Sequence, residues 1–280
     1  MKMKSTTNVM RKTHADRKPK STSGSYNRLY GDPIGNEMTK GQSNSIADGT
    51  ALEKRILEHI ENETFDFYKI QTRLDYDEVM KEFNSCRISD DTFDISDRVY
   101  LMHKSIFKDI KHGGKGIQPD LLVLLVKNGK ITFFVFELKT GDHFDTKKNP
   151  GEKVHLISFV EQLNVITGIN KVYKIIPFFS ELSKNKLSKE GFKNVFGENE
   201  ILTREELNEL FETDFDVIIK EYDSVRDINE TQFVDGICMH HSIQRKILMN
   251  PNIQNCIFDF MDDILDDTQK RKLSEKFNRL

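Results

Sequence analysis

The chain has 280 residues, of which 37% are hydrophobic and 31% are charged, and this composition is typical of a globular protein with a sizeable core. Its longest apolar runs, 121–126 and 133–136, are far shorter than the roughly 18 residues of a membrane-spanning helix. No apolar segment follows the N-terminal lysines, so we expect no secretory signal and a cytoplasmic protein. Three cysteines without a C-x-x-C pair exclude a disulfide framework and a structural zinc site.

The net charge of −3 is unevenly distributed along the chain. Residues 1–50 hold nine Lys/Arg against four Asp/Glu, and residues 100–153 hold ten against six, whereas residues 200–280 hold ten against eighteen. Two basic stretches in an acidic protein indicate a polyanionic partner, although solvated charged faces are a common alternative. Segment 1–49 has no hydrophobic periodicity, so we expect a basic and mostly disordered tail that either follows a phosphate backbone or only improves solubility.

The first periodic segment predicts an amphipathic helix over residues 51–63, with Thr50 as its N-cap. Glu53 lies on the inner face of this helix, where a carboxylate needs a partner or a metal ion. Similar patterns predict helices over 75–83 and 97–110, and the glycines of segment 111–116 predict a flexible loop.

The clearest local structure is a β-hairpin. Two apolar runs, 120–127 and 130–139, flank Asn128-Gly129, and this pair tolerates the positive φ angles of a type I′ turn. Both runs are apolar on both faces. We therefore expect these strands at the centre of a sheet that helices cover on each side.

The elements after the hairpin complete an α/β fold. They are predicted as a helix over 154–167 with Gly168 at its C′ position, a strand over 172–177, a helix from the capping box of Thr203 and Glu206 to about residue 212, a short strand over 215–219, and an acidic helical stretch over 252–277. A strand, a helix and a strand in that order imply a parallel crossover, so the sheet is mixed. We predict a mixed central β-sheet flanked by helices with a helical C-terminal extension, in one domain spanning 50–280. Its catalytic core covers about 51–180, and residues 200–280 are candidates for a specificity or dimerisation region.

The hairpin register brings polar side chains together at its open end. A two-residue turn makes Lys127 face Lys130, and by the same count Asp120 faces Glu137 with Lys139 on the same side of the sheet. Opposed like charges destabilise a sheet, so this pair needs a cation between the carboxylates, and Mg²⁺ is the natural candidate. The alternative is that these residues are strand-end polar groups and that Lys139 only bridges the two carboxylates.

Pro119-Asp120 followed by Glu137-Leu138-Lys139 resembles the motif of the PD-(D/E)XK nuclease superfamily, and the layout is most like that of a type II restriction endonuclease. The resemblance implies a restriction-endonuclease-like core in which Asp120 and Glu137 bind Mg²⁺, Lys139 activates or orients the attacking water, and Glu53 is an accessory acid at the metal. It also implies Mg²⁺-dependent cleavage of double-stranded DNA by a homodimer, with a cognate DNA methyltransferase in the same system.

The basic loops near the hairpin's open end supply candidates for DNA contacts. These are Lys111, Lys115, His143, Lys147, Lys148, Lys153 and Gln162. Gln162 resembles a glutamine that some superfamily members carry on the next helix, although Ile166 stands where those members have a tyrosine. Two other functions stay open: a structure-selective nuclease of repair or recombination, and a catalytically inactive nucleic-acid-binding domain with the same fold.

Overall fold

The computed structural model describes residues 51–140 and 149–241, together with isolated positions at 38, 266, 268, 269, 271, 272 and 275. The chain divides into two units, Ala47–Asp223 and the combination of Met1–Ile46 with Ser224–Leu280. Apart from the isolated positions, the predicted basic tail and the predicted helical stretch over 252–277 lie outside the described residues. Among the helices that are described, none combines the length and the apolar character needed to span a membrane.

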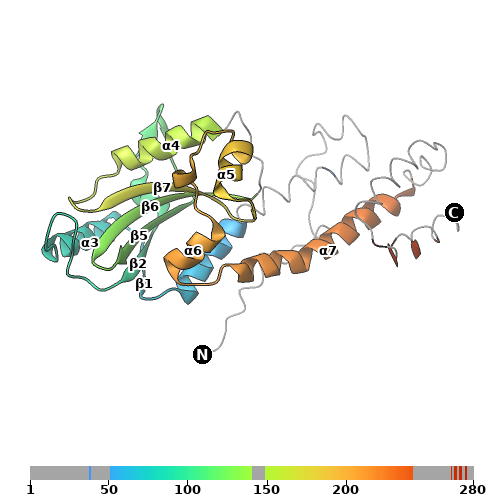
Figure 1. Ribbon diagram of the computed structural model, residues 1–280, viewed down its shortest axis with the longest axis horizontal. Coiled ribbons are helices and arrows are strands. Elements are labelled where there is room, and N and C mark those ends of the chain that lie inside the picture. Colours follow the sequence, from blue (N-terminus) through green and yellow to red (C-terminus); the bar gives the residue numbers. More distant parts are fainter. Residues whose placement is uncertain are drawn as a thin grey trace. The chain divides into compact units, whose positions relative to one another are not determined.

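A five-stranded mixed sheet forms the centre of the Ala47–Asp223 unit (Figure 1). Its order is β1-β2-β5-β6-β7, with strands β1 (Phe67–Ile70), β2 (Arg98–Met102), β5 (Leu121–Lys127), β6 (Lys130–Lys139) and β7 (Asn170–Pro177). The outer pairs β1–β2 and β6–β7 are parallel, while β2–β5 and β5–β6 are antiparallel. The predicted mixed sheet is confirmed, and β5 is its central strand.

The predicted hairpin is confirmed with its register. Lys127 pairs with Lys130 and Leu121 pairs with Phe136, which is the pairing that a two-residue turn requires. Asn128 and Gly129 both have positive φ angles, 52° and 68°, as a type I′ turn demands. The two strands run antiparallel from this turn, so the start of β5 and the end of β6 lie side by side at the end of the hairpin farthest from the turn.

Helices cover both faces of the sheet (Figure 1). One face packs against α3 (Arg73–Ser85) and α4 (Asn149–Gln162), and Phe107 links the layers through edge-on contacts with Phe133 and Phe159. The other face packs against helix 51–63, α6 (Arg204–Phe211) and the beginning of α7 (Asp216–Cys238), which supply a second set of buried apolar side chains. The shorter elements are the 3₁₀ helix η2 (Lys104–Phe107), the strands β3 (Lys111–His112) and β4 (Lys115–Gly116), α5 (Lys184–Lys186), the π-helical turn η3 (Leu187–Gly191) and η4 (Glu198–Glu200).

The predicted helix over 97–110 is wrong. The segment forms β2 and then η2, because the buried run Val99–Met102 pairs on one side with β1 and on the other with β5. This long-range pairing outweighs the helical spacing of the apolar residues. The loop predicted over 111–116 is instead a small hairpin of β3 and β4, with Gly113 and Gly114 at positive φ in its turn.

Two further boundaries differ from the predictions. The predicted strand over 215–219 is wrong: Phe215 lies in the turn before α7, and the helix begins at Asp216. Phe215 and Ile218 are both fully buried, at the three-residue spacing that a helical start allows. The helix predicted over 154–167 is α4, which begins five residues earlier at Asn149 and ends at Gln162. Gly168 is therefore not the residue after a helix. Its φ is +94°, and a Cβ atom there would lie 2.2 Å from the carbonyl oxygen of Asp90, so only glycine fits this close contact.

Candidate active site

The ends of β5 and β6 opposite the turn bring the three motif side chains together. Asp120 immediately precedes β5, and its Oδ2 accepts a hydrogen bond of 2.7 Å from the backbone N–H of Leu138. Glu137 and Lys139 lie two residues apart on β6 and therefore point to the same face, where Lys139 Nζ lies 3.1 Å from Glu137 Oε1. The carboxylate of Asp120 is thus anchored to the strand that carries the other two groups.

A second carboxylate holds Lys139 from the other side. Glu152, in the first turn of α4, places its Oε2 2.9 Å from Lys139 Nζ. The lysine does form a bridge, but it joins Glu137 to Glu152, whereas the alternative expectation was a bridge between Glu137 and Asp120. Glu152 was missed because the helix was predicted to begin at residue 154, which left this glutamate outside it.

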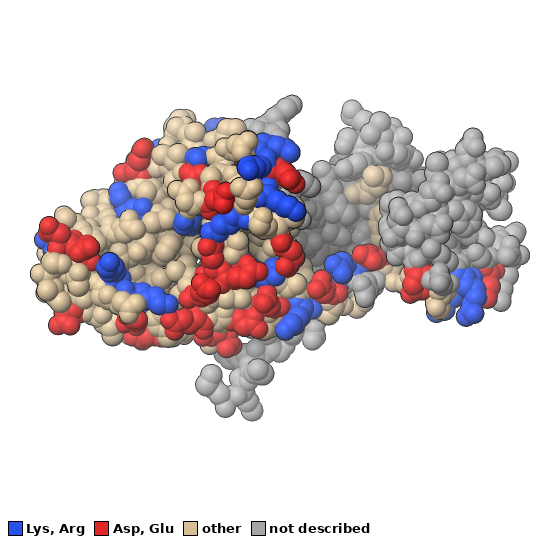
Figure 2. Space-filling view, viewed as in Figure 1, with Lys and Arg blue, Asp and Glu red and all other residues tan. Residues whose placement is uncertain are grey.

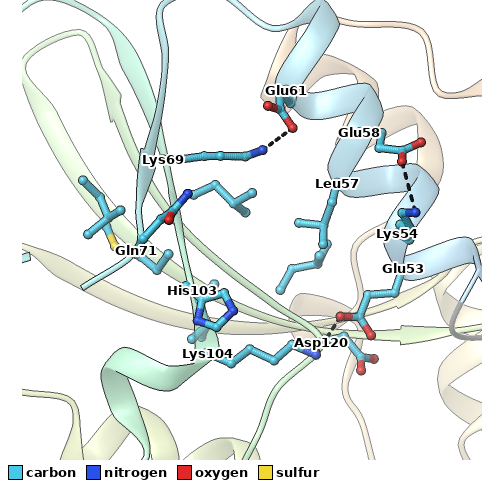
Figure 3. Close-up of a pocket in the computed structure, with 15 residues that line it drawn as sticks. Glu53, Lys54, Leu57, Glu58, Glu61, Lys69, Gln71, His103, Lys104 and Asp120 are labelled. Atoms are coloured by element: carbon cyan, nitrogen blue, oxygen red, sulfur yellow. Dashed lines mark hydrogen bonds and ion pairs between the residues drawn. The ribbon is translucent and has the colours of Figure 1, made fainter. Parts of the chain in front are cut away.

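Glu53 lies at the same edge and forms an ion pair with a lysine. Its Oε1 is 2.6 Å from the Nζ of Lys104, the first residue of η2, and Figure 3 shows the ammonium group of Lys104 pointing toward Glu53 and Asp120. These three residues line a pocket of about 690 Å³ whose other walls come mainly from helix 51–63, β1, β2 and the start of β5. Lys104 was missed because segment 97–110 was predicted as one helix, which gave no reason to place this residue beside the motif.

Burial and mutual repulsion perturb the carboxylates of the site. Burial and the neighbouring charge of Asp120 raise the pKa of Glu137 to about 7, and burial also raises the pKa of Asp120, although the hydrogen bond from Leu138 opposes that shift. Burial lowers the pKa of Lys139, but the charges of Glu137 and Glu152 outweigh this effect and leave the pKa above its ordinary value. Two crowded carboxylates with raised pKa values form an environment that a further cation would stabilise.

The donor set fits a hard divalent cation. Carboxylate oxygens are the ligands that Mg²⁺ prefers, and this ion usually takes one or two protein carboxylates and completes its shell with water and substrate oxygens. Asp120 and Glu137 can supply those two ligands, and Glu53 lies near Asp120 in the same pocket. Within residues 51–140 and 149–241, no group of three or more His, Cys, Asp or Glu side chains is arranged as a ready-made metal cage. A site with two protein ligands does not need one.

The predicted DNA contacts have different surroundings. Lys111 and Lys115 are exposed on the β3–β4 hairpin, and Lys153 donates to Val195 O and to Glu200 Oε2 at 2.9 and 2.7 Å. Gln162 donates from Nε2 to the carbonyl oxygen of Lys111 at 2.9 Å, at the far end of α4 from Glu152. The remaining candidates, His143, Lys147 and Lys148, lie outside the described residues.

One face of the molecule carries an acidic region and a basic region. Figure 2 shows acidic side chains gathered over α6 and Lys and Arg side chains over α5. The acidic character of α6 follows from its sequence, REELNELF. Because a DNA backbone is repelled by such a surface, the face over α6 is a poor position for a duplex.

Comparison with known proteins identifies a relative. No family model matches this chain, and no solved structure matches it. Over 207 residues the chain is 31% identical to the type II restriction enzyme HhaII from Haemophilus parahaemolyticus, an alignment that spans 71% of this chain and 82% of that enzyme. Similarity of this extent over most of both chains shows common descent. The chain therefore belongs to the family of type II restriction enzymes.

Proposed function

We propose that this protein is a Mg²⁺-dependent endonuclease of the PD-(D/E)XK type that hydrolyses phosphodiester bonds at a specific sequence in double-stranded DNA. The observation that carries the proposal is the convergence of Asp120, Glu137 and Lys139 at one end of the central hairpin. Membership of the restriction-enzyme family supports the same reaction, since the relative is named for it.

Each side chain has a defined role in the proposed mechanism. Asp120 and Glu137 would hold Mg²⁺, which when bound supplies Lewis-acid polarisation of the phosphoryl oxygens and lowers the pKa of water. Lys139 orients the attacking water from its position beside Glu137, and the Leu138 N–H keeps Asp120 in place. Glu53 is an accessory acid at the metal.

The proposal extends to the assembly and its partners. Restriction of a duplex requires two strand cleavages, so we expect a homodimer that presents two sites to the DNA, and a DNA methyltransferase of matching specificity in the same system. We also expect Lys111 and Lys115 to contact phosphates, because both are exposed on the β3–β4 hairpin. Gln162, the last residue of α4, holds this hairpin against the helix through its hydrogen bond to Lys111. Sedimentation of the protein with and without DNA measures the predicted dimer.

The deciding experiment is cleavage of phage DNA. The purified protein is incubated with Mg²⁺ and the ends of the fragments are sequenced, with Asp120→Asn as the inactive control. We expect discrete fragments that end at one repeated sequence and carry 5′-phosphates, and we expect EDTA to stop the reaction. Cleavage only at branches or ends would instead identify a repair nuclease. DNA binding without any cleavage in Mg²⁺ or Mn²⁺ would identify an inactive binding domain.

A further inference from the structure

The candidate site contains a second lysine, Lys104, which pairs with one of the carboxylates expected near the metal. Four carboxylates, from Asp120, Glu137, Glu152 and Glu53, surround the ends of β5 and β6, and two ammonium groups lie among them. Lys139 is held by Glu137 and Glu152, while Lys104 pairs with Glu53 next to Asp120 (Figure 3). The two lysines therefore divide the acidic residues between them.

Lys104 occupies one oxygen of Glu53 and lies near Asp120 in the same pocket. Its Nζ is 2.6 Å from Glu53 Oε1, and its charge acts on Asp120, where it offsets part of the effect of burial on the pKa of that carboxylate. Oxygen ligands bind Mg²⁺ at about 2.0 to 2.1 Å, so an ammonium group and a metal ion cannot both contact the same side of Glu53. An ion that binds Glu53 on the side where Lys104 now lies must displace Lys104.

Lys104 is also the more easily displaced of the two lysines. Its side chain is 32% exposed and contacts Glu53, whereas that of Lys139 is 18% exposed and lies between two carboxylates. Lys104 stands at the start of the four-residue helix η2 and beside an open pocket, so its flexible stem has room to turn. After displacement the ammonium group would stay within a side-chain length of the metal, where the proposed reaction places a substrate phosphate.

On these grounds we propose that Lys104 is an exchangeable counter-ion of the metal site: it neutralises Glu53 and Asp120 before the metal arrives, is displaced by the metal, and then contacts the DNA phosphate. This inference rests on the proposed nuclease function and adds a residue to it. Loss of the ammonium group should therefore have two opposite effects. The protein should bind the metal more tightly, because a competing cation is gone, and it should cleave DNA more slowly, because a phosphate contact is lost.

The test measures metal binding and cleavage separately in Lys104→Met, which keeps the length of the side chain and removes its charge. Binding of Mn²⁺ to the DNA-free protein is followed by the electron paramagnetic resonance signal of the free ion. We expect the Kd for Mn²⁺ to fall by about fivefold or more, as removal of one charge about 4 Å from the ion implies. At saturating Mg²⁺ we expect kcat for DNA cleavage to fall by roughly tenfold or more, because one electrostatic contact to the reacting phosphate is lost.

Two further variants act as controls. Lys108→Met removes an exposed lysine at the end of the same short helix and should change neither quantity, while Lys104→Arg keeps the charge and should keep the wild-type affinity for Mn²⁺. An unchanged or weaker Mn²⁺ affinity in Lys104→Met overturns the counter-ion role. Tighter Mn²⁺ binding with an unchanged kcat overturns the phosphate contact. If the wild-type protein cleaves no DNA, the proposed function fails, but the comparison of Mn²⁺ affinities still decides whether Lys104 competes with the metal.

Discussion

The two lysines of the site differ in the structures that carry them. Lys139 comes from an internal strand of the sheet and contacts carboxylates of β6 and α4, whereas Lys104 comes from a short 3₁₀ helix and contacts one carboxylate of helix 51–63. A side chain fixed from two sides keeps its position while a substrate binds and leaves. A side chain held from one side can change partners. From this difference we expect two equal charges in one site to have separate tasks, which depend on how firmly each side chain is held.

The largest effect is expected for the firmly held lysine. Lys139→Ala should lower the single-turnover rate of DNA cleavage by about 10²–10⁴-fold, the range typical of the loss of a group that takes part in proton transfer or water positioning. DNA binding in Ca²⁺, measured by gel shift, should stay close to that of the wild type because phosphate contacts elsewhere are intact. Retention of most of the cleavage rate would show that the two lysines do not differ as described.

A smaller effect is expected for the carboxylate that holds Lys139. Glu152→Gln should lower kcat by roughly tenfold with little change in KM, because a neutral amide fixes the ammonium group less firmly than a carboxylate. Glu152→Asp should recover part of the loss, and Glu161→Gln, on the exposed side of α4, should have no effect. An increase in the Mg²⁺ concentration required for half-maximal rate would contradict this role and identify Glu152 as a metal ligand.

The pH dependence of metal binding should follow Glu137. Its pKa of about 7 means that the carboxylate is largely protonated at pH 6 and ionised at pH 8. Binding of Mg²⁺ requires the ionised form, so the affinity of the DNA-free protein for Mg²⁺ should rise as the pH increases through 7. Calorimetric titration at pH 6, 7 and 8 measures this change. Glu137→Gln should bind weakly and without this pH dependence.

The smallest effect concerns stability in the absence of metal. Because the pKa of Glu137 is raised from 4.5 to about 7 in the folded state, its contribution to stability is fully present below pH 4.5 and is lost as the pH rises through 7. Glu137→Gln should therefore raise the free energy of unfolding at pH 8 by about 1–3 kcal/mol and change it little at pH 4.5. Urea titrations in EDTA test this. Glu161→Gln serves as the control, and an equal effect at both pH values would exclude ionisation as the cause.

The hairpin and its motif were predictable because their determinants are local. Asn128-Gly129 selects the turn, the turn selects the register, and the register places Asp120 close to Glu137 and Lys139. The mixed sheet followed from the order of the elements. None of these inferences required knowledge of a distant part of the chain.

Lys104 and Glu152 were not predictable in this way. The identity of β2 depends on simultaneous pairing with β1 and β5, so the apolar spacing of segment 97–110 alone indicates the wrong structure. The beginning of α4 is likewise set by packing, since Asn149 is buried at its first position although the sequence there is polar and contains a proline and a glycine. Both missed residues lie at element boundaries that tertiary contacts determine.

The distance between the Asn128-Gly129 turn and the acidic end of the hairpin has a consequence for how this enzyme can evolve. Residues between them can be exchanged for others of similar volume, but an inserted or deleted residue in one strand would invert the sides on which all later side chains emerge. Natural selection should therefore tolerate substitutions in β5 and β6 and eliminate changes in their length. Descendants of this gene should keep the same number of residues between the turn and the carboxylates even where few amino acids remain identical.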